Sequence, residues 1–282
     1  MKKIFLTVLG VAALLSFHSC LPLDNYTAPG STWEGTVTDS YTNAPILSSQ
    51  NDWQMDIWER SWTKQPNGAT ASQQLRIKQD GTYENTKLFD GTYDLIPHGP
   101  FWPIDTIKGL ELKKYLKYDF TVTPYLQVLD FKTQLYQGPQ LDSKGNPTGV
   151  MLDSVKFTFR IKAPLLTSPK GVALPRLYQM RVFFSLTPFC GNGSNSSIGP
   201  SEYTAKTTMN NNFSEAKGVF IECANNNNFS WANILDSNNT TQTITLSTRV
   251  KSQYTYNVRV GASVYDTYQK MCYSPIVNIV VP

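Results

Sequence analysis

Few residues in this chain have the types and spacing that catalysis would require. The densest acidic stretch is 52–59, where Asp56 and Glu59 could in principle form the carboxylate pair of a glycoside hydrolase. Side chains three positions apart on a strand point to opposite faces, so this pair would not converge on one bond. A charged solvent face is therefore the better interpretation of the stretch.

Other catalytic motifs are missing from the sequence. Apart from His18 near the start, His98 is the sole histidine, which leaves one candidate for a Ser-His or Cys-His triad. The sequence has no Gly-x-Ser-x-Gly elbow, no CxxC motif and no Gly-rich phosphate loop. We therefore predict a protein that is not an enzyme and that uses no metal or cofactor.

The tryptophans are better candidates for binding chemistry, because five of the six lie before residue 103. Strand alternation places Trp53 on one face with core residues and Trp58 on the other face with Asp56. Trp62 follows in a polar stretch, and Trp102 lies in the proline-rich segment 97–103. Our hypothesis is that Trp58, Trp62 and Trp102 are exposed rings that stack on a sugar, while Asp56 accepts hydroxyl hydrogen bonds. The alternative is that these rings cover the rim of a small core or contact the second domain.

The first twenty residues predict export and lipidation. Two lysines precede an apolar run from Ile4 to Leu15, which is too short to span a bilayer but suits a signal peptide. The run is followed by Ser19-Cys20, which resembles a lipobox. We predict a signal peptide at 1–19, lipid on Cys20, and a tether at 20–30. An ordinary signal peptide with an incidental cysteine is the alternative. No later apolar run has membrane length, so the lipid would be the only membrane contact.

Charge and the remaining cysteines limit the other partners. The formal net charge is +4, and the densest basic stretch, 108–117, is interrupted by Glu111. Because nothing here resembles a row of phosphate-binding cations, nucleic acid is not an expected partner. Cys190, Cys223 and Cys272 allow one disulfide at most. Three free buried thiols are an equally good interpretation.

From residue 31 onward, short alternating stretches separated by turns predict an all-β protein. Asp80-Gly81 and Asp90-Gly91 predict tight turns, the second joining 87–89 to 92–96. About six short strands before residue 123 indicate a small antiparallel sandwich. A boundary is expected at 123–125, and about seven more strands with Asn-rich loops indicate a second sandwich. The predicted domains are 31–123 and 124–282.

Several motifs together resemble a known family. They are Asp24-Asn25-Tyr26, Gly35-x-Val37-x-Asp39, Asp80-Gly81-x-Tyr83-x-Asn85, Leu88-Phe89-x-Gly91-x-Tyr93, Gly99-Pro100-Phe101 and Asp119-Phe120-x-Val122-Thr123-Pro124-Tyr125. They are similar to a Bacteroidota lipoprotein family of unknown function, domain of unknown function 3823. The resemblance implies a prealbumin-like or carboxypeptidase-regulatory-like first sandwich and an immunoglobulin-like or fibronectin-III-like second one.

The same resemblance implies a place in the cell. Members of this family tend to be encoded beside SusC/SusD-like pairs that import glycans at the outer membrane. The expected protein is thus lipid-anchored at the outer membrane, with the cell surface favoured over the periplasmic face. Its expected partners are an oligosaccharide or polysaccharide and the SusC/SusD-like complex. The rival hypothesis is a non-catalytic assembly partner of that transporter complex with no direct glycan contact.

Overall fold

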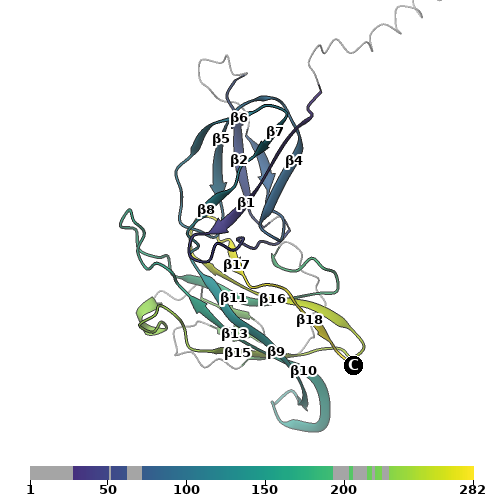
Figure 1. Ribbon diagram of the computed structural model, residues 1–282. Helices are drawn as coiled ribbons and strands as arrows, with labels where there is room; N and C mark the ends of the chain where they lie inside the picture. Colours follow the sequence, from purple (N-terminus) through teal and green to yellow (C-terminus); the bar gives the residue numbers. More distant parts are fainter. Residues whose placement is uncertain are drawn as a thin grey trace, which may run out of the picture.

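The computed structural model describes residues 28–50, 52–61, 72–192, 203–205, 215–217, 220–223 and 229–282. The predicted signal peptide, Cys20 and Trp62 lie outside these residues. Within them the chain is almost entirely β-strand, arranged as two tandem β-sandwich domains, one above the other in Figure 1. None of the helices among the described residues is long and apolar enough to cross a membrane.

The first domain stacks two sheets. One has the order β4-β1-β7, with β8 also pairing to β1, and the other has the order β3-β2-β5-β6. Both sheets turn alternate side chains inward, and Trp53 is 1% exposed, which confirms its predicted core position. The strands are β1 (Ser31–Asp39), β2 (Gln54–Glu59), β3 (Gln73–Arg76), β4 (Thr82–Leu88), β5 (Gly91–His98), β6 (Ile107–Leu112), β7 (Tyr115–Lys117) and β8 (Phe120–Val122).

Two features of this domain differ from the sequence prediction. The turn at Asp90-Gly91 does not close a hairpin, because β4 pairs with β1 whereas β5 pairs with β2 in the other sheet. The Asp90 carboxylate instead accepts hydrogen bonds from the Ser31 hydroxyl and the Lys114 amide. In addition, β7 and β8 pair with β1 in parallel, so the domain is not purely antiparallel. Strands of three residues are too short to show a period of two.

The second domain is a sandwich of the sheets β12-β15-β10-β9 and β13-β14-β11-β16-β17, with β18 also pairing to β16. Its core is formed by alternating apolar residues of both sheets, such as Phe157 and Val258. The long hairpin β9–β10 projects from the far end of the domain (Figure 1). The strands are β9 (Gln127–Leu141), β10 (Pro147–Lys162), β11 (Leu177–Ser185), β12 (Tyr203–Ala205), β13 (Glu215–Lys217), β14 (Phe220–Glu222), β15 (Ile244–Arg249), β16 (Thr255–Val264), β17 (Met271–Tyr273) and β18 (Val277–Val280).

A buried polar network joins the two domains. Arg259 on β16 is 1% exposed and donates from Nη1 to the carbonyl oxygen of Ser48 at 2.6 Å. Tyr273 on β17 donates its hydroxyl to Asp52 at 2.8 Å. Buried polar groups are costly unless they are paired, so these contacts hold the domains in a fixed relation. The same region buries Cys190, and the three described cysteines are buried thiols that form no disulfide with one another, as one of the two interpretations expected.

Candidate functional site

The outer face of the sheet β3-β2-β5-β6 carries two of the three predicted binding residues that the structure describes, Asp56 and Trp58. Along β2, Met55 and Ile57 point into the core, whereas Asp56 and Trp58 are partly exposed on the opposite face. The register pairs Trp58 with Asp94 of β5. Alternation therefore places Asp56 and Trp58 on one surface, two positions apart, or about 7 Å along the strand.

Asp56 forms the centre of a chain of contacts that reaches the second domain. The Nε2–H of His98, at the end of β5, donates to Asp56 Oδ2 at 3.0 Å. Tyr268 packs against the His98 ring, with 4.6 Å between the two ring centroids. Tyr268 follows β16 in the sequence and is 45% exposed. The face is therefore composite, with a carboxylate and an imidazole from one domain and a phenol ring from the other.

The turn that carries Tyr268 is held in place by Asp266. Asp266 Oδ1 accepts hydrogen bonds from the amides of Tyr268 and Gln269. Burial raises the pKa of Asp266, although these amide hydrogen bonds and the contact with Tyr125 oppose that shift. Because the turn is anchored to the domain junction through Tyr125, the ring of Tyr268 keeps its position without being buried.

Trp58 lies in a cation–π contact. The guanidinium carbon of Arg60 is 5.6 Å from its ring centroid, and Arg60 Nε donates to Asp94 Oδ2 at 2.8 Å. The indole Nε1 is buried and has no hydrogen-bond partner among the described residues. A ligand would thus meet carbon atoms of the Trp58 ring and the polar edge of Arg60.

The prediction that Trp102 is an exposed ring is wrong. Trp102 is 5% exposed and packs in the core of the second domain, 5.1 Å from Tyr125 between ring centroids. Its neighbour Phe101 packs in the first domain against Trp53. Consecutive residues of an extended segment point in opposite directions, so this pair joins two cores. Contact with the second domain was the alternative considered for these rings, and for Trp102 it is the correct one.

The possible hydrolase pair does not converge. Asp56 and Glu59 lie three positions apart on β2, and Glu59 Oε1 accepts a hydrogen bond from the Ser61 amide at 2.6 Å. The part of the chain that the structure describes also contains no cluster of three or more His, Cys, Asp or Glu side chains suited to a metal ion.

Sequence reasoning missed His98 and Tyr268 as members of this face. His98 was noted only as the single histidine that a triad could use, and Tyr268 carried no distinguishing signal. The alternation of β5 puts His98 on the outer face, and that could have been predicted. The place of Tyr268 depends on how the two domains dock.

Two family models match the chain. The model described as "Protein of unknown function (DUF3823) N-terminal domain" matches residues 31–123, and "Domain of unknown function (DUF3823_C)" matches residues 152–278. No curated protein matches.

Solved structures have the same fold. A DUF3823 family protein from Bacteroides uniformis is 18% identical with a TM-score of 0.61, and one from Parabacteroides merdae is 18% identical with a TM-score of 0.55. A third protein, also from Bacteroides uniformis and provisionally described as carbohydrate binding, is 20% identical with a TM-score of 0.59. Each alignment covers 90% of this chain and 100% of the other.

Proposed function

Since the chain belongs to the DUF3823 family, we propose that it is a lipid-anchored, non-catalytic glycan-binding protein of the outer membrane, accessory to a SusC/SusD-like uptake complex. The observation that carries this proposal is the composite face formed by Trp58, Asp56, His98 and Tyr268. A relative of the same fold, provisionally described as carbohydrate binding, supports the ligand class.

The chemistry of the face suits an oligosaccharide. Pyranose rings have an apolar CH face that packs on aromatic rings, and Tyr268 offers a half-exposed ring for this purpose. Asp56 and Arg60 supply an acceptor and donors for hydroxyl groups. Each stacked ring would contribute about 1–3 kcal/mol, by analogy with the stacking of nucleic-acid bases. Binding would therefore be weak per site and would gain from several sites on one membrane.

Affinity electrophoresis in gels that contain xylan, β-glucan, galactomannan or pectin tests this function. We expect one of these polymers to retard the protein, and Tyr268→Ala and Trp58→Ala to reduce the retardation at least threefold. Tyr41→Ala is the matched control, because Tyr41 is an exposed aromatic of the first domain that lies outside the face. If both variants are folded and are retarded as strongly as the wild type, the polymer binds at another surface of the protein.

The membrane anchor is tested separately. The lipobox-like Ser19-Cys20 supports acylation of Cys20 after removal of residues 1–19. Radiolabelled palmitate should enter the wild-type protein and be absent from Cys20→Ser. Protease added to intact cells should then digest the protein if it faces outward and spare it if it faces the periplasm.

A second function, an assembly partner of the transporter without glycan contact, is favoured by one observation. The projecting β9–β10 hairpin exposes Leu135, Tyr136, Val150 and Met151. Exposed apolar side chains on an isolated hairpin are typical of protein contacts. Met151→Asp combined with Tyr136→Asp should reduce copurification with a SusC/SusD-like complex while leaving glycan retention unchanged.

A further inference from the structure

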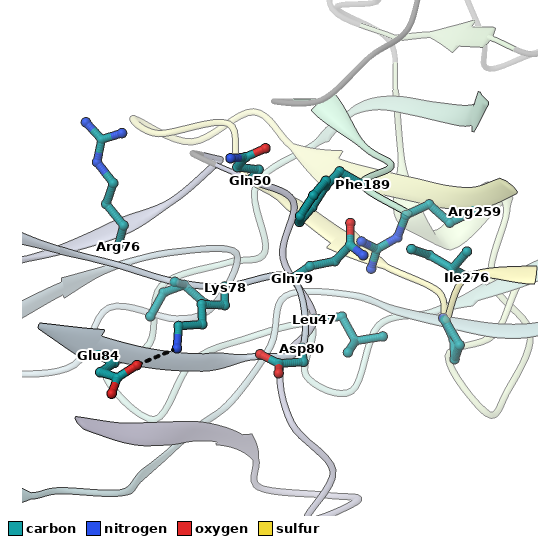
Figure 2. Close-up of a pocket in the computed structure, with 12 residues that line it drawn as sticks. Leu47, Gln50, Arg76, Lys78, Gln79, Asp80, Glu84, Phe189, Arg259 and Ile276 are labelled. Carbon is teal, nitrogen blue, oxygen red and sulfur yellow. Dashed lines mark hydrogen bonds and ion pairs between the residues drawn. The ribbon is translucent and has the colours of Figure 1, made fainter. Parts of the chain in front are cut away.

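A cleft separate from the aromatic face lies between the two domains (Figure 2). Its volume is about 790 Å³, within the usual range for small-molecule sites. The first domain contributes the segments around Leu47 and Gln79, and the second contributes Phe189 and Ile276. Because the buried contact of Arg259 with Ser48 crosses the same junction, the walls of the cleft are fixed relative to each other.

Phe189 is the unusual residue of this cleft, because its side chain is 51% exposed although its backbone is firmly held. Gln79 of the first domain uses both ends of its amide for this purpose. Its Nε2 donates to the Pro188 carbonyl at 2.9 Å, and its Oε1 accepts from the Cys190 amide at 2.9 Å. The flanking residues are therefore clamped from the opposite domain, and the exposed ring is preorganised.

The surroundings of the ring combine apolar and polar groups. Leu47 and Ile276 supply apolar surface, and Gln50, Arg76 and Asp80 line the polar part. Asp80 Oδ1 accepts a hydrogen bond from the Thr82 hydroxyl at 2.7 Å.

The charges in the cleft nearly balance. Lys78 pairs with Glu84 at 2.9 Å, and Arg76 has the opposite charge to Asp80. The Arg259 guanidinium is directed to the carbonyl oxygens of Ser48, Cys190 and Ser274. The lining thus has three cationic and two anionic side chains, but the surplus cation, Arg259, is buried and already directed to carbonyl oxygens, so a strongly charged ligand would find no accessible excess of opposite charge here. An exposed aromatic ring beside neutral and balanced polar groups suits a neutral sugar.

We propose that the interdomain cleft is a second carbohydrate subsite that binds one neutral pyranose, with its CH face on the Phe189 ring and its hydroxyl groups toward Gln50 and Asp80. This inference rests on the proposed glycan-binding function, but it concerns different residues. The full mature protein would then contact a glycan at two separate places.

The test uses ¹⁵N-labelled full mature protein and four probes: the methyl pyranosides of glucose, galactose, mannose and xylose. At least one probe should shift the side-chain amide signals of Gln79. Phe189→Ala should weaken the binding of that probe at least tenfold, whereas Phe189→Trp should still bind it. Leu186→Ala is the matched control, because Leu186 is an exposed apolar residue of the same loop that does not line the cleft. Thermal melting confirms that each variant is folded.

The outcomes separate the two sites. Loss of the Gln79 shifts in Phe189→Ala, with binding kept in Trp58→Ala and Tyr268→Ala, supports the cleft whether or not the aromatic face binds. If Phe189→Ala binds every probe as wild type does, the cleft proposal is wrong even where the face is correct. Absence of any Gln79 shift at 50 mM probe overturns the cleft proposal as well. Polymer retardation that depends on Tyr268 alone would then leave the proposed function in place.

Discussion

Arg259 Nη1 lies 2.6 Å from the carbonyl oxygen of Ser48, and this contact joins the two domains through residues that are 211 positions apart in the chain. The same guanidinium also donates to the carbonyl oxygens of Cys190 and Ser274, at 3.3 and 3.1 Å. A buried cation that satisfies three carbonyl groups is a strong determinant of how the domains dock. Both proposed glycan sites depend on that docking, because each combines residues of the two domains.

Replacement of Arg259 by methionine should lower the free energy of unfolding by about 2–5 kcal/mol, because three buried carbonyl oxygens would lose their donor. Arg160→Met is the matched control, since Arg160 forms its ion pair with Asp130 at the surface. That substitution should cost about 0–1 kcal/mol. Equilibrium denaturation measures both. Equal effects of the two substitutions would show that Arg259 does not hold the junction.

The pH dependence of stability should reveal the raised pKa of the Asp52 carboxyl group. Burial raises the pKa of Asp52, although the Tyr273 hydroxyl and Lys270 oppose the shift. Between the ordinary pKa and the raised value, the folded state binds more protons than the unfolded state, so stability declines as the pH rises through this window. The free energy of unfolding of the wild type minus that of Asp52→Asn should therefore fall with pH, by at most about 1.4 kcal/mol per pH unit.

Asp105→Asn provides a control of opposite sign for this measurement. The hydrogen bond and charge of Lys170 lower the pKa of Asp105. Its contribution is therefore present at neutral pH and is lost on acidification. Urea titrations of the wild type, Asp52→Asn and Asp105→Asn at intervals between pH 3 and 8 would give both pH dependences. A wild-type advantage over Asp52→Asn that grows with pH would contradict the assignment.

Trp102→Ala should destabilise the protein by about 3–5 kcal/mol, because the substitution leaves a cavity in the core of the second domain. Trp58→Ala should cost about 1 kcal/mol or less, since that ring is partly exposed and no core cluster contains it. Thermal and chemical denaturation of the two variants would distinguish a structural tryptophan from a surface one. The reverse order would invalidate the assignment of Trp102 to the core.

Gly81 should tolerate no side chain. Its φ is +84°, and a Cβ atom would lie 2.7 Å from the carbonyl oxygen of Ile46. Gly145 has almost the same φ, +85°, but open space around it. Both alanine substitutions carry the backbone strain of about 1–2 kcal/mol, so the additional loss in Gly81→Ala reports the clash alone. We expect Gly81→Ala to be the more destabilising by at least about 1 kcal/mol in urea denaturation.

Thiol counting should distinguish the states of all four cysteines. Burial raises the pKa of Cys190 and Cys272 to about 12, so neither forms the reactive thiolate in the folded protein. A thiol reagent should label no cysteine of the native protein and, if Cys20 carries lipid as proposed, three cysteines after denaturation. A fourth labelled thiol would show that Cys20 carries no lipid, and a single one would show a disulfide.

The sequence by itself determined what depends on local periodicity. The alternation of 53–58 was enough to put Trp53 in the core and Asp56 and Trp58 on the outer face, because successive side chains of a strand point to opposite sides. The same period of two predicted two all-β domains. The Asp80-Gly81 pair also predicted the tight turn at Gly81. Glycine adopts the positive φ of this position without strain.

Only the tertiary structure decided what depends on docking. Trp102 lies among prolines, where no period exists, and its burial follows from Tyr125 across the junction. Tyr268 meets His98, and Gln79 clamps the backbone around Phe189, only because two sandwiches pack in one orientation. Contacts between distant segments arise from the shapes and polar groups of whole surfaces, and no short stretch of sequence contains that information.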